Sequence, residues 1–208
     1  LNNKAKELNL PMIAADLSDP ISVEELKIEM IRDHGHPNII VNAAGGVCNQ
    51  VANDLENVTT EQWGQIFQSN VDSAFYISRA FVTGMKKNSW GRIVTISSGA
   101  GLRPSLTGIQ AYTAAKHALV GLTKQLSSEL GKYGITVNSI APGFILSNPT
   151  TQKQWDSYGE KGQTELINRI HTRRLGKPED IASTIAFLTS KEANWISGQI
   201  ISVDGGIS

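Results

Sequence analysis

The sequence has few of the features that mark secreted, membrane-bound or nucleic-acid-binding proteins. It contains one cysteine, Cys48, which excludes an internal disulfide and fits a reducing compartment. Nineteen Lys and Arg balance nineteen Asp and Glu, and a net charge of zero gives no support for binding nucleic acid or an anionic membrane. No run of about 18 apolar residues is present, and the N-terminal LNNKAKELNL lacks the apolar core of a signal peptide. These absences predict a soluble, cytoplasmic protein.

What the sequence does contain is an alternation of apolar runs with helical patterns. The apolar runs predict strands at residues 11–15, 38–42, 93–96, 134–143 and 198–203. Helices are expected at residues 1–8, 20–33, 61–87 and 111–132 and from 178 onward. Runs that are apolar throughout, such as NIIV, indicate strands buried on both faces of a parallel sheet. The alternation predicts one Rossmann-like α/β domain over residues 1–208, a doubly wound, mostly parallel sheet with helices on both faces.

Helix starts and apolar helix faces can also be placed. Ser18 or Asp19 is expected to cap the helix at 20–33, and Thr59 or Thr60 the long helix at 61–87. The apolar face of that long helix is expected to include Trp63, Ile66, Phe67, Val71, Phe75 and Ile77.

The stretch from Arg92 to Leu126 is the centre of the predicted site. A β-branched run leads through a small-residue loop into a helix on which Tyr112 and Lys116 lie four residues apart, on one face. A phenol has a reference pKa of about 10, so proton exchange near neutral pH needs a neighbour, such as the Lys116 ammonium, that stabilises the phenolate. Ser98 can place a hydroxyl beside the phenol, where it would hydrogen-bond a substrate oxygen. Together these side chains predict an acid/base site without a metal.

Taken alone, a Tyr and a Lys at this spacing are more often a half-buried aromatic residue and a solvated charge. Several other motifs accompany them in a fixed order. They are NAAG at residues 42–45, Asn70, Ser98, YTAAK at 112–116, PG at 142–143 and VDGG at 203–206. This order resembles that of the short-chain dehydrogenase/reductase family, and the resemblance covers essentially the whole chain.

The resemblance implies a role for each catalytic side chain. Tyr112 would donate or accept the proton, Ser98 would polarise the substrate oxygen, and Lys116 would lower the pKa of the phenol and hydrogen-bond the nicotinamide ribose. Asn70 would hold a water that links Lys116 to solvent; the alternative is a polar residue at a local helix kink. Ser97 is expected to point away, because adjacent strand residues face opposite sides.

The resemblance also implies an NAD or NADP cofactor. Asp16 would accept a hydrogen bond from the adenine amino group, with helix capping as the alternative role. Asn42, Ala43 and Gly45 would let the backbone approach the adenosine ribose. On the nicotinamide side the implied contacts are Pro142, Gly143, Ile145 and Ser147.

One part of the family pattern is missing from the sequence. The N-terminal βαβ unit, whose glycine-rich turn receives the pyrophosphate, has no counterpart, so the choice between NAD and NADP cannot be read. In the family sheet order the two absent strands lie between residues 11–15 and 38–42, which predicts unpaired strand edges and an exposed apolar face. A longer chain is the favoured explanation; a partner or a rearrangement is the alternative.

Residues 146–174 are expected to form a polar lid over the substrate, since long polar loops beside a rigid scaffold set specificity. The candidate substrate contacts in this segment are Trp155, Tyr158, Arg169, His171, Arg173 and Arg174, although such residues more often pack in lids and interfaces. Arg103, in the loop after Ser98, is a further candidate for contact with an acidic substrate group.

These features predict an NAD(P)-dependent oxidoreductase that interconverts a secondary alcohol and a ketone, with Tyr112 handling the proton. A 3-oxoacyl thioester and a sugar or polyol are the first substrate classes to consider, by analogy. The alternative is a catalytically silent oligomeric or interaction protein that has lost its nucleotide-binding half. The resemblance further implies a homotetramer, or else a dimer, paired through the helices at 61–87 and 111–132 and the C-terminal strand.

Overall fold

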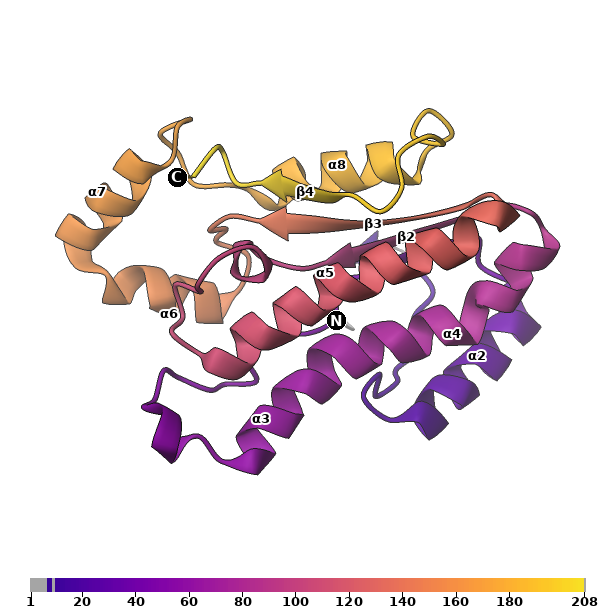
Figure 1. The fold of residues 1–208 in the computed structure, drawn as a ribbon, viewed down its shortest axis with the longest axis horizontal. Helices are drawn as coiled ribbons and strands as arrows, with labels where there is room; N and C mark the ends of the chain where they lie inside the picture. Colours follow the sequence, from indigo (N-terminus) through magenta and orange to yellow (C-terminus); the bar gives the residue numbers. More distant parts are fainter. Residues whose placement is uncertain (1–6, 9, 208) are drawn as a thin grey trace.

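A computed structural model describes residues 7–8 and 10–207, and a parallel sheet lies at its centre (Figure 1). Its four strands pair in the order β1-β2-β3-β4. They are β1 (Ile39–Asn42), β2 (Gly91–Ile96), β3 (Ile135–Pro142) and β4 (Ile200–Val203). In the register, Ile40 lies opposite Ile93, and Ile93 opposite Val137, so the carboxyl ends of the strands meet at one edge.

Helices cover both faces of the sheet, as the alternating pattern predicted (Figure 1). On one face lie α2 (Pro20–His34), α4 (Ser73–Lys87) and α5 (Gln110–Leu130), and on the other lies α8 (Pro178–Thr189). Phe81 and Met85 of α4 pack against Ile93 in the core of the first face, while Leu188 of α8 is buried on Val94 and Ile140. The remaining α-helices are α3 (Thr60–Phe67), α6 (Pro149–Ser157) and α7 (Gly159–Arg169). This is a Rossmann-like arrangement of a parallel sheet and helices.

The expected buried strand at residues 11–15 is wrong. The segment is irregular, and Met12 is exposed. A strand exists only through hydrogen bonds to a neighbour, and within the described residues no strand pairs with this segment. Of the helix expected at residues 1–8, Glu7 and Leu8 are helical and the rest lies outside the described residues.

Strand β1 is buried on one face, not on both as its continuous hydrophobicity indicated. Ile40 and Asn42 are buried, whereas Ile39 and Val41 are 45% and 41% exposed. Helix α4 contacts β1, and among the described residues β1 forms the edge of the sheet, with β2 as its neighbour. The exposed Ile39 and Val41 are the open apolar face that the sequence predicted.

The helix expected at 61–87 is divided by a π-helical turn. Thr59 and Gln62 form a capping box at the start of α3, and the turn Gln68–Asp72 separates α3 from α4. The side-chain amide Nδ2 of Asn70 donates to the Ile66 carbonyl, 2.8 Å away, and so occupies the acceptor that the backbone N–H of Asn70 would use in a regular α-helix. Of the expected apolar face, Ile66 and Ile77 are buried, but Trp63 and Phe75 are exposed.

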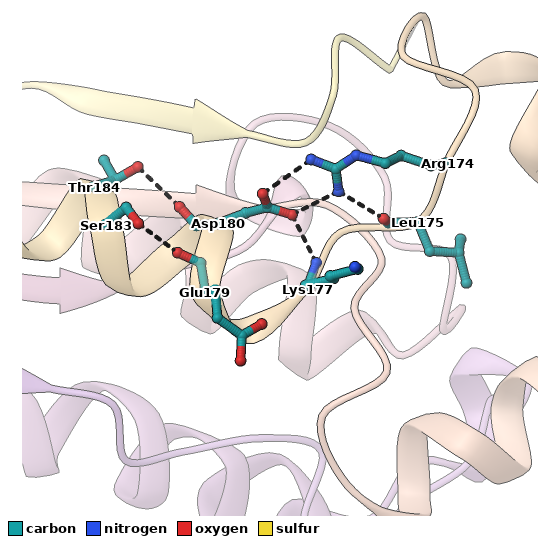
Figure 2. A network of polar contacts seen from close by, with 7 residues as sticks. All are labelled: Arg174, Leu175, Lys177, Glu179, Asp180, Ser183 and Thr184. Carbon is teal, nitrogen blue, oxygen red and sulfur yellow. Dashed lines mark hydrogen bonds and ion pairs between the residues drawn. The ribbon is translucent and has the colours of Figure 1, made fainter.

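Residues 146–174 contain two helices where a polar loop was expected. Asn148 accepts from the amides of Thr150 and Thr151 at the start of α6, and α7 follows directly. Figure 2 shows the polar network that then begins α8: Asp180 accepts two hydrogen bonds from Arg174, at 2.7 and 2.9 Å, and one from the Lys177 amide. The Arg174 guanidinium holds the pKa of the Asp180 carboxyl well below its usual range.

The start of α2 is capped by one of the two residues that the sequence predicted. Asp19, one of the two candidates, caps α2 by accepting from the amides of Ile21 and Ser22.

In the described part of the chain no helix combines the length and the apolar character needed to cross a membrane.

We predict that Leu188→Ala lowers the free energy of unfolding by about 2 to 5 kcal/mol, because it leaves a cavity between α8 and the sheet. Urea unfolding measures this. Phe187→Ala, which removes an exposed side chain one residue earlier, is the matched control and should cost about 1 kcal/mol or less. Equal losses in both variants would contradict the packing of α8 on β2 and β3.

Candidate active site

A cavity of about 550 Å³ opens at the carboxyl ends of the strands. Its wall includes residues 43–46 after β1, residues 97–100 after β2, residues 143–145 after β3, and Ile207 after β4. The carboxyl ends of an open parallel sheet are where such folds bind their ligands. The topology of the sheet thus builds the cavity.

Ser98, Tyr112 and Lys116 all lie in the wall of this cavity, as the sequence predicted. Helix α5 begins at Gln110, and its buried Ala111 and Ala115 pack against Ile66, which holds Tyr112 between them at the cavity wall. The Ser98 hydroxyl lies beside the Tyr112 phenol, where it acts to lower the pKa of that phenol. The strand and the helix therefore bring a hydroxyl and a phenol together.

Ser97 has a different part in the site from its neighbour Ser98. It is buried, and its hydroxyl donates to the Lys116 carbonyl at 3.0 Å, which ties β2 to α5. Ser97 is nevertheless one of the residues that line the cavity, so its expected orientation away from the site stays a prediction. The same junction explains Gly101, where a Cβ would lie 2.7 Å from the Lys116 carbonyl oxygen.

Lys116 is buried beside the phenol. Its Nζ donates to the Ile96 carbonyl at 2.9 Å and lies 5.5 Å from the centre of the Tyr112 ring. Burial disfavours the ammonium form and lowers the pKa of Lys116 to about 8. Near neutral pH the ammonium therefore persists, with a proton that is more easily given up than that of an exposed lysine.

The pKa of Tyr112 is shifted upward, opposite to the expectation that Lys116 lowers it. Burial raises the pKa of the phenol, and the hydrogen bond with Ser98 offsets only part of that rise. The cause is that desolvation of a phenolate outweighs the nearby polar groups. At neutral pH the phenol therefore holds its proton, as a group that protonates a carbonyl oxygen must.

Asn70 supports the site without lining the cavity. Its side chain is fully buried; Nδ2 donates to the carbonyls of Gly46 (2.9 Å) and Ile66, and Oδ1 accepts from the Gly46 amide (3.0 Å). A Cβ on Gly45 would lie 2.5 Å from Oδ1 of Asn70, so only glycine fits there. The structure thus gives Asn70 the helix-kink position that was the alternative, and adds contacts that fix residues 45–46.

Most of the residues implied for a cofactor lie in the cavity wall. These are Ala43, Gly45, Pro142, Gly143, Ile145 and Ser147. Asn42 is not in the wall; it is buried, and its Oδ1 accepts from the Ala44 amide at 3.2 Å. Gly46 has a φ of 142° with open space where a Cβ would stand, so a ligand can approach its backbone. The small residues of the wall therefore fit a flat nicotinamide ring and its ribose.

Asp16 is not brought to the cavity wall. Its carboxylate accepts hydrogen bonds from the amide and the hydroxyl of Ser18, at 2.9 and 2.6 Å, in the turn before α2. These bonds lower the pKa of Asp16. The alternative role of Asp16, capping the following helix, is wrong, because Asp19 caps α2 and Asp16 instead closes the turn before it. An adenine contact stays a prediction.

The expected substrate contacts of residues 146–174 divide into two groups. Arg169 lies in the cavity wall, but His171, Arg173 and Arg174 do not, and Arg173 donates to the Asn168 carbonyl instead. Trp155 and Tyr158 pack on the ring of Phe144, with ring centres 5.9 and 5.8 Å away. They hold Phe144, which does line the cavity.

Sequence reasoning missed several wall residues. They are Ser105, Leu106, Thr107, Phe144, Thr151, Gln154, Ile181 and Ile185. Phe144 directly follows the PG motif, and Ser105 to Thr107 lie between Ser98 and Tyr112, so proximity in sequence could have indicated these. Nothing in the sequence pattern indicated Thr151, Gln154 or the α8 residues, because they reach the cavity only through the path of α6, α7 and α8.

We predict that Asn70→Ala costs about 3 kcal/mol of folding free energy, because it leaves the buried polar groups of Gly46 without their partner. Thermal or urea unfolding gives the value. Asn194→Ala, at an exposed position, is the control and should change the stability by less than about 0.5 kcal/mol. A cost no larger than that of the control would show that Asn70 does not hold residues 45–46.

We also predict a pH-dependent gain from Lys116→Met. The wild type carries the cost of a buried ammonium in full below pH 8, the folded-state pKa, and loses that cost as the pH rises toward the unfolded value of 10.5. The stability of Lys116→Met relative to wild type should therefore fall by about 2 kcal/mol between pH 7 and pH 9.5. Urea unfolding at both pH values tests this, and a difference independent of pH would contradict the lowered pKa.

Comparison with known proteins agrees with this geometry. A family model described as enoyl-(acyl carrier protein) reductase matches residues 1–208. The 3-oxoacyl-[acyl-carrier-protein] reductase FabG of Vibrio cholerae is 34% identical over 195 residues, which cover 94% of this chain and 76% of the relative. D-beta-hydroxybutyrate dehydrogenase of Rhizobium meliloti is 36% identical over 200 residues, covering 92% and 76%.

The solved structures include one that was determined with a cofactor. "ElxO with NADP Bound" is 31% identical, with a TM-score of 0.85, and the match covers 98% of this chain and 80% of that one. A full-length family match, relatives above 30% identity and the same arrangement of sheet and helices agree with the motif order read from the sequence. The chain therefore belongs to the short-chain dehydrogenase/reductase family, whose members are oxidoreductases acting on CH–OH groups.

Proposed function

We propose that this protein interconverts a secondary alcohol and a ketone with NAD or NADP as the hydride carrier. The observation that carries the proposal is the convergence of Ser98, Tyr112 and buried Lys116 on the wall of one cavity at the carboxyl ends of the strands. The nicotinamide cofactor supplies or accepts the hydride when bound. The names of the relatives, a 3-oxoacyl reductase and a hydroxybutyrate dehydrogenase, support an oxygenated acyl chain as the substrate class.

Tyr112 carries the proton in this proposal. In the reducing direction its Oη gives a proton to the carbonyl oxygen, and in the oxidising direction the phenolate accepts the proton of the alcohol. Ser98 donates a hydrogen bond to the same substrate oxygen. Lys116, at 5.5 Å from the Tyr112 ring, stabilises the phenolate when it forms and can contact the ribose of the cofactor.

The residues that would hold the cofactor are those of the cavity wall at the ends of β1 and β3. Ala43, Gly45 and Gly46 offer backbone to the ribose side, and Pro142, Gly143, Ile145 and Ser147 to the nicotinamide side. Asn42 and Asp16 remain candidates for the adenosine end.

Two further elements of the proposal concern the lid and the assembly. Residues 146–174 would act as the lid, because Thr151 and Gln154 of α6 and Arg169 of α7 already reach the cavity. A homotetramer, or else a dimer, is supported by the exposed aromatic residues Trp63, Phe75 and Trp195. The alternative of a catalytically silent protein is not favoured, because the chain retains Ser98, Tyr112 and Lys116 in the wall of one cavity.

We predict that Tyr112→Phe in the full-length protein lowers kcat/KM for ketone reduction by about 10²- to 10⁴-fold, because the ring keeps its packing but loses the transferable proton. NADH or NADPH oxidation with a ketone panel measures this. Tyr133→Phe, outside the cavity wall, is the control and should leave the rate unchanged within about threefold. Carbonyl reduction at the wild-type rate by Tyr112→Phe would overturn the mechanism.

A further inference from the structure

The charged side chains that line the described part of the cavity are cationic. Among its described residues are three cationic side chains, Arg103, Lys116 and Arg169, and no Asp or Glu. Lys116 is accounted for by the Ile96 carbonyl and by Tyr112. A cavity whose charged groups are all cationic favours an anion, and Arg103 is the cation that follows Ser98 in the same loop.

Arg103 is held in place with most of its hydrogen-bonding capacity unused. Among the described residues its ion-pair partner is Asp204, with Nη2 3.5 Å from Oδ2, and its side chain is 39% exposed. Its guanidinium also packs beside Gly99, where a Cβ would stand 3.4 Å from Nη2. A guanidinium has five N–H donors and binds a carboxylate best through two of them. The single 3.5 Å contact with Asp204 leaves N–H donors of Arg103 available for a second carboxylate.

Asp204 itself is fixed, which makes it a support for Arg103. Its Oδ1 accepts from the Gly206 amide at 3.0 Å in the turn that follows β4, and its side chain is only 10% exposed. A Cβ on Gly143 would lie 2.8 Å from Asp204 Cα, so the ends of β3 and β4 are in close contact at this point. Asp204 therefore restrains the Arg103 guanidinium through their ion pair. Arg103, but not Asp204, is one of the residues that line the cavity.

We infer that the substrate carries a carboxylate and that Arg103 binds it, so that the substrate class is a hydroxy acid and its oxo acid. This inference rests on the proposed function and deepens it: Tyr112 and Ser98 act on the alcohol or carbonyl oxygen, while Arg103 recognises the acid group of the same molecule. The polar wall residues Ser105 and Thr107, whose hydroxyls lie 2.8 Å apart, continue this side of the cavity.

The test compares an acid with its own neutral ester. With full-length protein and oxidised cofactor, kcat/KM is measured for 3-hydroxybutyrate and for methyl 3-hydroxybutyrate in wild type and in Arg103→Met. The variant should lose roughly ten- to a hundredfold with the acid and less than about threefold with the ester, since charge-assisted bonds to a carboxylate are lost only with the acid. Arg32→Met, at an exposed arginine paired with Asp33 in α2, is the matched control and should change neither value.

A readout without turnover separates binding from support of the fold. Malonate, an unreactive carboxylate, should raise the thermal midpoint of the wild type and of Asp204→Asn but not that of Arg103→Met. If Arg103 serves only to join its loop to Asp204, then Arg103→Met and Asp204→Asn will lose activity equally with acid and ester, which would overturn the inference.

Each of three further outcomes would contradict the inference. Unchanged discrimination between acid and ester in Arg103→Met would overturn the inference while Tyr112-dependent turnover keeps the proposed function intact. A selective loss with acetoacetyl coenzyme A but not with 3-hydroxybutyrate would mean that Arg103 binds the phosphates of the coenzyme A moiety, and would contradict a carboxylate. No Tyr112-dependent turnover of any alcohol or ketone would overturn the proposed function, and the inference with it.

Discussion

Parallel pairing of β1, β2 and β3 is the constraint on which the site depends. Because the three strands run in the same direction and in register, residues 43–46, Ser98 and Pro142 all emerge at one edge of the sheet. Each strand alone ends in a short loop of small residues with no chemistry of its own. Their common edge makes a cavity, and α5 then brings Tyr112 and Lys116 to its wall.

Burial sets the protonation of that pair in opposite directions. The same low-dielectric surroundings raise the pKa of the Tyr112 phenol and lower the pKa of the Lys116 ammonium to about 8. The two pKa values therefore move apart, and the Lys116 ammonium gives up its proton at a lower pH than the Tyr112 phenol. A phenol that keeps its proton next to an ammonium that gives one up readily is suited to relaying a proton to and from a substrate oxygen. Selectivity in the cavity then comes from other residues, of which Arg103 is the charged one beside Ser98.

The sequence was a good guide wherever a residue's role follows from its own strand or helix. The i, i+4 spacing of Tyr112 and Lys116, and the position of Ser98 after an apolar run, needed only the periodicity of helices and strands. The parallel sheet followed from runs without alternation. Prediction from the sequence failed where the structure of a segment depends on contacts with other segments. Residues 11–15 have no partner strand among the described residues, and β1 exposes Ile39 and Val41. Likewise the π turn at Asn70 depends on Gly46, 24 residues away. The direction of the Tyr112 pKa depends on burial, which charge spacing alone does not give.

The central claim is that this cavity moves a hydride directly between a nicotinamide and a carbinol carbon while Tyr112 moves the proton. The measurement that tests it most directly is the fate of a label: a ketone is reduced with NADPH or NADH deuterated at the reactive C4 position, and the alcohol is analysed by NMR and mass spectrometry. The account predicts one deuterium, bound to the carbinol carbon and on one face only, with none entering that carbon from D₂O when unlabelled cofactor is used. Deuterium taken up at that carbon from solvent, or a product without the label, would contradict it.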